Sequence, residues 1–172
     1  MDHANVGLDL LTRLFRPEHN LPVFYIDGQS QGNEQNSLPR KAKIAIAQAE
    51  SETVDPGKFR IYWQAIGDRT NNEAEYYALL KALQLITEKA DRKDPGKTEQ
   101  DLVRSDSKLV VNQVNGLWRV EDEKLIELSG QARETIEKLG TVRLEWVPRE
   151  ENFAGLWLEG KLRPVSVERL RE

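Results

Sequence analysis

The sequence predicts a single α/β domain built on a mixed β-sheet with helices on its faces, and three observations predict it. The β-rich segments of the first half follow one another without an intervening helix, which favours an antiparallel meander. Two later β-rich segments alternate with helical ones, a pattern typical of parallel pairing. The chain has 172 residues, enough for one domain with its own core. The predicted strands are 23–28, 41–49, 59–66, 101–106 and 142–146.

The first strand is predicted at Val23-Phe24-Tyr25-Ile26-Asp27-Gly28, a nearly continuous apolar run typical of central strands that are buried on both faces. Asp27 then lies at the C-terminal end of this strand, and the polar segment Gln29–Arg40 is predicted to be a loop. A turn containing Asp55-Pro56-Gly57 joins the next two strands. The three strands together form the predicted meander.

A long helix is predicted to begin at Thr70, because Thr70 followed three residues later by Glu73 is the signature of a capping box. Glu75 heads one face of this helix, and the rest of that face is apolar. A buried carboxylate that stays ionised and unpaired costs several kcal/mol. Either a cation, from a basic side chain or a metal, therefore lies over Glu75, or this carboxylate sits at the edge of the apolar face and reaches water.

The remaining elements alternate along the second half of the chain. The strand 101–106 is followed at once by a short helix. A second long amphipathic helix spans 121–139, and the strand 142–146 comes after it. A short last helix spans 152–159, with Asn152 as its cap.

Three parts of the chain differ in character. Residues 21–160 form the predicted domain, and residues 161–172 form a charged C-terminal tail. Residues 1–20 are predicted to form an N-terminal extension with a short amphipathic helix. This helix is expected to pack on the domain, and a docking element for another protein is the alternative.

The composition restricts the chemistry of this chain. It has no cysteine, which excludes disulfides, thiol catalysis and thiolate metal sites and fits a reducing compartment. Its two histidines, His3 and His19, lie in the N-terminal extension, so a metal in the domain must be held by oxygen ligands, which suits Mg²⁺ or Mn²⁺. The net charge of −4 argues against a broadly basic nucleic-acid surface but not against a local one. Since no long apolar run and no basic leader occur, we expect a cytoplasmic protein without a membrane span.

Three carboxylates have comparable positions in these elements. Asp27 and Asp106 each end a strand, and Glu75 begins a helix on the face of the sheet. If the two strands are parallel neighbours, both aspartates emerge at the same edge, where open α/β sheets place their sites. Three carboxylates repel one another, so the cluster implies divalent metal, and two Mg²⁺ ions about 3.5–4 Å apart can activate water and stabilise the leaving oxygen of a phosphodiester. Taken singly, Asp27-Gly28 is equally well a turn and Asp106 part of a helix cap.

Four sequence motifs resemble those of ribonuclease H type 1. They are Asp27-Gly28-Gln29-Ser30-Gln31-Gly32-Asn33, Thr70-Asn71-Asn72-Glu73-Ala74-Glu75, Ser105-Asp106-Ser107-Lys108-Leu109-Val110 with Gly116-Leu117-Trp118, and Trp146-Val147-Pro148-Arg149-Glu150-Glu151-Asn152. The resemblance covers residues 21–159 and is to the shorter, reverse-transcriptase-like branch, because the basic protrusion of longer members has no counterpart between Gly116 and Leu125. It implies a ribonuclease H-like fold with a five-stranded sheet, and hydrolysis of the RNA strand of RNA/DNA hybrids with two Mg²⁺ or Mn²⁺ ions.

The resemblance also implies roles for individual residues. Asp27 would bridge both ions, and Glu75 and Asp106 would complete the ion on the leaving-group side. Glu75 would also sense the RNA 2′-hydroxyl, and Lys108, which stands where relatives often carry an amide, would meet a phosphate. Loop and cap chemistry accounts equally well for each of the asparagines. The positions that match hybrid-contacting residues are Gly28, Ser30, Asn33, Asn71 and Asn72.

The last helix departs from the family pattern. Members usually carry Asn-x-x-Asp there, whereas Asn152-Phe153-Ala154 leads to Gly155, so the fourth acid is missing. Glu159 is the expected replacement, because it lies on the same helical face, about 6 Å further along the axis, and helical side chains lean toward the N-terminus. The alternative is that Gly155 is a defect, Glu159 an exposed last-turn residue, and the domain a catalytically impaired nucleic-acid-binding module. The preceding loop also lacks the histidine of longer members, for which Arg149 or Glu150 is at best a partial substitute.

Tryptophans provide stacking surfaces for nucleic acid in many proteins. Trp63 and Trp146 are expected in the core, because both lie in predicted strands. Trp118, which comes just after a helix and beside Arg119, is the better surface candidate.

Overall fold

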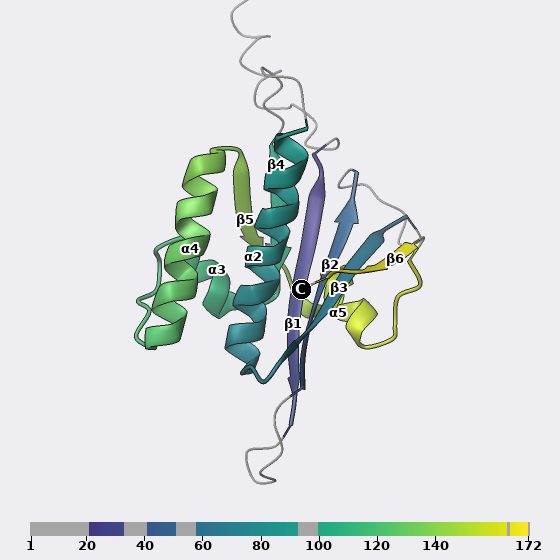
Figure 1. The fold of residues 1–172 in the computed structure, drawn as a ribbon, viewed down its shortest axis with the longest axis horizontal. Helices are drawn as coiled ribbons and strands as arrows, with labels where there is room; N and C mark the ends of the chain where they lie inside the picture. Colours follow the sequence, from purple (N-terminus) through teal and green to yellow (C-terminus); the bar gives the residue numbers. More distant parts are fainter. Residues whose placement is uncertain (1–20, 33–40, 51–57, 93–99, 165, 172) are drawn as a thin grey trace, which may run out of the picture.

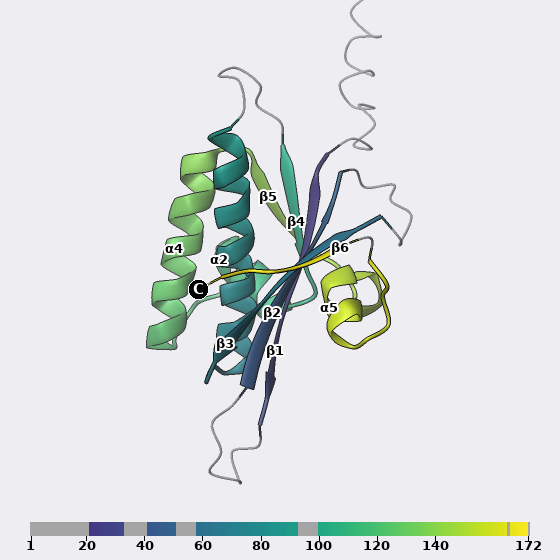
Figure 2. The same cartoon turned by 45° about the vertical axis from the view of Figure 1, so that its right-hand side comes forward.

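The fold is a six-stranded mixed sheet with helices on both faces, in the strand order β5-β4-β1-β2-β3-β6 (Figures 1 and 2). A computed structural model describes residues 21–32, 41–50, 58–92, 100–164 and 166–171. The strands are β1 Val23–Gln31, β2 Lys41–Ala49, β3 Arg60–Gly67, β4 Asp101–Ser105, β5 Val142–Trp146 and β6 Ser166–Arg169. The helices are α2 Asn71–Ala90, α3 Lys108–Val114, α4 Glu123–Leu139 and α5 Phe153–Leu158, with a 3₁₀ turn at Arg149–Glu151.

The strand pairing confirms the predicted mixture of antiparallel and parallel strands. β1, β2 and β3 form an antiparallel meander. β1 also pairs in parallel with β4, and β4 in parallel with β5. β1 is therefore the central strand that the apolar run at its start predicts, and its first six residues are buried.

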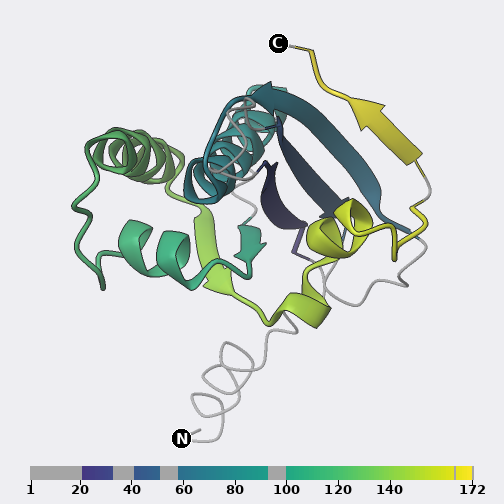
Figure 3. The ribbon, with the colours of Figure 1, turned by 90° about the horizontal axis from the view of Figure 1, so that it is seen from below.

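The structure corrects two strand predictions. β1 does not end at Gly28 but continues to Gln31, because the hairpin with β2 extends beyond the core and its last pairs, down to Gln31↔Lys41, rest on backbone hydrogen bonds. The sheet has six strands rather than five, because β6 adds to β3 in parallel at the edge of the sheet (Figure 3). All four β6 side chains are exposed, so no hydrophobic pattern marks this strand in the sequence.

The helices divide the core into two layers. α2 packs on β1 and β2, and α4 packs mainly on α2, so both lie on one side of the sheet, whereas α5 covers the other side (Figure 2). The predicted capping box at the start of α2 is confirmed: Thr70 Oγ1 accepts a hydrogen bond from the Glu73 nitrogen at 3.1 Å, and the Glu73 carboxylate accepts one from the Thr70 nitrogen at 2.7 Å. This cap fixes where α2 begins and hence where Glu75 lies.

Some predictions concern residues outside the described ranges. They are the helix in residues 1–20, most of the loop before β2 and the turn at Asp55-Pro56-Gly57. Within the described part of the chain, no helix is both long and apolar enough to cross a membrane. The division into residues 1–20, 21–160 and 161–172 and the cytoplasmic location stay predictions.

Candidate metal centre

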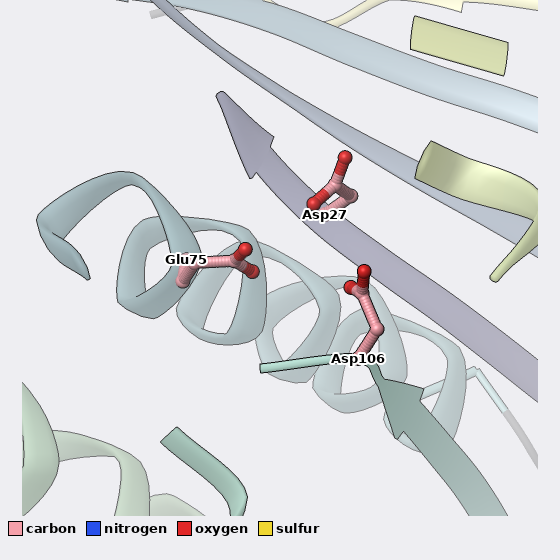
Figure 4. A group of neighbouring side chains, drawn as sticks. All are labelled: Asp27, Glu75 and Asp106. Carbon is pink, nitrogen blue, oxygen red and sulfur yellow. The ribbon is translucent and has the colours of Figure 1, made fainter. Parts of the chain in front are cut away.

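Three carboxylates from distant parts of the chain meet at one rim of the sheet. Asp27 comes from β1, Glu75 from the start of α2, and Asp106 from the residue just after β4. One carboxylate oxygen of each lies within 4.8 Å of the others. Figure 4 shows the three side chains converging from these separate elements. The predicted convergence of these three acids is confirmed.

The sheet register brings the two aspartates together. β1 and β4 are parallel neighbours, and Ile26 pairs with Ser105, so Asp27 and Asp106 are the residues that follow a paired position. β4 ends there, whereas β1 continues to Gln31. The prediction that Asp27 lies at the end of its strand was therefore wrong. The Asp27 side chain is fully buried, and the end of β4 leaves Asp106 free to turn toward it.

Gly28 brings Glu75 to the aspartates. A Cβ atom at this position would lie 2.2 Å from the Ala74 carbonyl carbon and 2.5 Å from the Glu75 nitrogen. These distances are too short for any side chain, and the clashing atoms belong to the backbone of α2. Glycine is thus required for the close crossing of β1 and α2 that sets Glu75 beside Asp27.

The electrostatics of the cluster call for a cation. Burial, together with the charges of Asp27 and Asp106, raises the pKa of Glu75 well above its usual value. Burial and the charge of Asp106 also raise the pKa of Asp27, and Arg149 opposes this rise. Among the residues that the structure describes, no group hydrogen-bonds to Glu75 Oε2, which is buried. Of the two alternatives for Glu75, the cation is the one this buried oxygen favours, and a set of carboxylate oxygens fits Mg²⁺ or Mn²⁺.

Arg149 inserts its guanidinium into the acidic cluster. Its Nη1 donates to Asp27 Oδ1 at 3.0 Å and to Asp106 Oδ2 at 2.8 Å. Its Nε and Nη2 both donate to Glu159 Oε1, at 3.1 and 2.9 Å. Glu159 therefore lies beyond Arg149, outside the described cluster of three carboxylates, and reaches it only through the guanidinium. The sequence suggested Arg149 only as a partial substitute for a missing histidine.

Asn152 is a site residue that the sequence assigned only to a helix cap. Its side-chain nitrogen donates to the Ile26 carbonyl at 2.9 Å and to Asp106 Oδ1 at 2.6 Å. The side-chain oxygen caps α5 by accepting from the Gly155 nitrogen. Asn152 thus ties the Asp106 carboxylate to the β1 backbone beside Asp27. The signal that could have found it is its place three residues before the missing acid, in the Asn-x-x-Asp pattern of the family.

Four of the predicted nucleic-acid contacts are exposed or partly exposed, namely Ser30, Asn71, Asn72 and Lys108. The Ser30 nitrogen donates to Asn71 Oδ1 at 2.8 Å, so these two residues are brought together, and Asn72 is exposed beside them. The Lys108 ammonium lies 4.7 Å from the centre of the Trp146 ring. Gly28, by contrast, is buried against α2. Asn33 lies outside the described residues.

The tryptophan predictions were partly wrong. Trp146 is 44% exposed rather than in the core, because it is the last residue of an edge strand and its indole nitrogen donates to the Asp106 carbonyl at 3.1 Å. Trp63 is half-buried, and Trp118 is exposed, as predicted. Trp146 with Lys108 is therefore the aromatic surface next to the acidic cluster.

Comparison with known proteins gives the family. The reverse transcriptase-like family matches residues 55–158, well over half of the chain. The chain belongs to this branch of the ribonuclease H type 1 family. The fold agrees, with an antiparallel β1–β3 meander, parallel inner strands and helices on the sheet. The curated relatives include ribonuclease HI of Halobacterium salinarum, 31% identical over 143 residues, which are 83% of this chain and 64% of that protein.

Solved structures of ribonuclease H1 proteins share this fold. The N-terminal ribonuclease H domain of the Mycobacterium tuberculosis protein Rv2228c superposes with a TM-score of 0.63 at 33% identity, covering 81% of this chain and 91% of that one. LC11-RNase H1 in complex with an RNA/DNA hybrid gives a TM-score of 0.62 at 28% identity, over 76% and 88%. This chain spans only 22% of the length of full-length bifunctional Rv2228c, to which it is 42% identical over 89 residues.

Proposed function

We propose that this ribonuclease H family member is a metal-dependent endoribonuclease that hydrolyses the RNA strand of RNA/DNA hybrids. The observation that carries the proposal is the meeting of Asp27, Glu75 and Asp106 within 4.8 Å. A relative of the same fold binds such a hybrid in its crystal structure, which supports the choice of substrate. The type of reaction, hydrolysis of the RNA strand, is inferred from the family resemblance.

Mg²⁺ or Mn²⁺ is the proposed cofactor, and Asp27, Glu75 and Asp106 would hold it. When bound, such an ion supplies Lewis-acid stabilisation of the charge that develops on the phosphodiester oxygens. The family resemblance implies two ions, and their number in this chain depends on Arg149, which already contributes a positive charge to the cluster. Asn152 keeps Asp106 oriented toward Asp27 through its two hydrogen bonds.

The proposed hybrid-binding residues follow from the family resemblance, and contacts within the structure support some of them. Ser30 and Asn71 hydrogen-bond to each other at the junction of β1 and α2, where they can face one strand. Lys108 supplies a positive charge for a phosphate, and Trp146 an exposed ring beside it. Gly28, Asn33 and Asn72 complete the proposed set. A hybrid bound here is held through local charge, since the chain as a whole carries a net charge of −4.

Two observations favour a second candidate function. Arg149 ion-pairs with both Asp27 and Asp106, and Gly155 replaces the fourth acid of the family. A domain whose metal centre is inactivated in this way would bind RNA/DNA hybrids without cleaving them. Its affinity would fall as salt rises, since phosphate contacts carry the binding.

Cleavage of a labelled RNA/DNA hybrid separates the two functions. We expect the wild-type protein to cut the RNA strand with Mg²⁺ or Mn²⁺, and Asp27→Asn to lose at least about a hundredfold in rate, as loss of a group central to transition-state stabilisation does. Asp91→Asn, an exposed aspartate at the end of α2, is the matched control and should cut normally. Salt-sensitive binding with no cleavage by any of the three proteins would reject the enzyme and favour the binding module.

A further inference from the structure

Arg149 brings a permanent positive charge into the metal centre. Its Nη1 lies 3.0 Å from Asp27 Oδ1 and 2.8 Å from Asp106 Oδ2, two of the oxygens that would otherwise face a cation. A guanidinium stays protonated in proteins, so this charge is present at every working pH. Three carboxylates and one guanidinium leave two negative charges, which a single divalent ion balances.

Gly155 leaves the space that Arg149 uses. A Cβ at position 155 would lie 3.0 Å from Arg149 Cζ and Nη1, and 3.2 Å from Asp27 Oδ2. Position 155 therefore faces Asp27 directly, and any side chain there would compete with the guanidinium for the same volume. The glycine at 155 and the arginine at 149 are thus two parts of one arrangement.

Glu159 holds Arg149 in this position. Its Oε1 accepts from both Nε and Nη2 of Arg149, and its Oε2 lies 2.8 Å from the Lys161 ammonium. An exposed ion pair of this kind adds little stability. Two hydrogen bonds to one edge of a planar guanidinium do fix its orientation, so the opposite edge points at Asp27 and Asp106. Glu159 acts through Arg149 and is a positioning residue.

We propose that Arg149 takes the place of one of the two divalent ions, so that this chain binds a single Mg²⁺ or Mn²⁺ ion at Asp27, Glu75 and Asp106. Gly155 provides the room and Glu159 the orientation for the guanidinium. The inference rests on the proposed function, because it concerns the cation content of the same centre. It makes Gly155 part of a rearranged site rather than a defect.

Mn²⁺ binding measured by electron paramagnetic resonance of the free ion tests the inference. We expect one Mn²⁺ per chain for the wild type and two for the double variant Arg149→Ala/Gly155→Asp, which removes the guanidinium and restores the fourth acid. Two ions bound by the wild type, or one by a folded double variant, would overturn it. Circular dichroism establishes that each variant is folded.

The single variant Arg149→Ala gives an independent measurement. Removing a positive charge that lies about 3 Å from two ligands should tighten Mn²⁺ binding at least about tenfold, because charges this close interact strongly even near a protein surface. Arg143→Ala, which removes an exposed arginine paired with Glu145 on β5, should leave the affinity unchanged. Unchanged or weaker binding in Arg149→Ala would mean that Arg149 only organises the ligands, and the inference would fail.

The hybrid-cleavage assay keeps the two proposals apart. If neither the wild type nor the double variant cuts the hybrid, the proposed function fails, while the Mn²⁺ stoichiometry still decides the role of Arg149. If the wild type cuts the hybrid yet binds two ions, only the inference about Arg149 fails.

Discussion

Gly28 faces the backbone of α2, and the absence of its side chain determines how closely β1 and the helix cross. The clash that a Cβ would cause involves the Ala74 carbonyl and the Glu75 nitrogen, so no change of rotamer relieves it. The helix itself would have to move, and Glu75 would move with it. A residue that carries no functional group thus controls the distance between two proposed metal ligands.

Gly28→Ala is therefore expected to lose about 1–3 kcal/mol of unfolding free energy, the usual cost of forcing extra volume into a packed site. It should also bind Mn²⁺ more weakly. Gly130→Ala is the matched control, because a Cβ at this exposed position in α4 meets nothing within 4 Å. Alanine there should stabilise the protein by roughly 0.5–1 kcal/mol. Urea unfolding measures the stability of both variants and of the wild type. A Gly28→Ala variant as stable as the wild type would show that the crossing of β1 and α2 can relax.

The sequence located some site residues and missed others for a physical reason. Asp27, Glu75 and Asp106 were predictable because each follows from a local signal, the end of an apolar strand or the start of a capped helix. The pairing of Arg149 with Glu159 was not, since it depends on side-chain directions in two segments and on empty space at a third position. Spacing along one helix suggested Glu159 as a ligand, and spacing alone contains no information about what lies in between.

At the scale of the element, the capped first turn of α2 fixes the position of Glu75, which directly follows that turn. Glu73 closes the capping box and also lies 3.5 Å from the Lys124 ammonium at the start of α4. Burial alone would raise the pKa of Glu73, but hydrogen bonds from Thr70 and the charge of Lys124 outweigh it and lower this pKa below its usual 4.5. A lowered pKa means that Glu73 stabilises the fold above pH 4.5 and loses this contribution as the pH falls through its folded-state pKa.

Glu73→Gln is expected to cost about 1 kcal/mol of unfolding free energy at pH 7, a typical value for a helix cap. The difference from the wild type should shrink as the pH falls below about 4.5, because the wild-type carboxylate then becomes protonated as well. Urea unfolding between pH 3 and 7 measures this. Glu88→Gln, on the exposed face of the same helix, serves as the control. A difference that stays constant with pH would mean that the charge of Glu73 adds nothing.

The elements that sequence patterns predicted are those with a buried face. α2, α4 and the first five strands all bury at least one side chain, and hydrophobic periodicity or capping residues mark them. β6 buries no side chain and pairs with β3 through its backbone. Its sequence therefore has no hydrophobic periodicity that could predict a strand. The same holds for the end of β1, where polar residues continue a strand that the hairpin register maintains.

At the scale of the whole molecule, the buried and mutually repelling carboxylates at one rim of the sheet reduce the stability of the metal-free fold. Without metal, the raised pKa values of Asp27 and Glu75 mean that the folded state resists their ionisation. Their contribution to stability is full below their usual pKa values and is lost as the pH rises through the folded-state values. At neutral pH the metal-free protein is thus less stable than its packing alone would make it, and a divalent ion reverses this loss.

Mn²⁺ should therefore stabilise the wild-type protein at pH 7. At a free Mn²⁺ concentration one hundred times the dissociation constant, binding adds about 2.7 kcal/mol to the free energy of unfolding. For a domain of this size, each kcal/mol raises Tm by roughly 2–4 °C. Asp27→Asn should gain little from Mn²⁺, yet in EDTA it should unfold at or above the wild-type temperature, because it removes a buried charge from a repulsive cluster. Thermal unfolding of the wild type and of Asp27→Asn, each in EDTA and in Mn²⁺, gives the four Tm values needed. If Mn²⁺ stabilised both proteins equally, the ion would be bound elsewhere, and the three carboxylates would not form the metal centre.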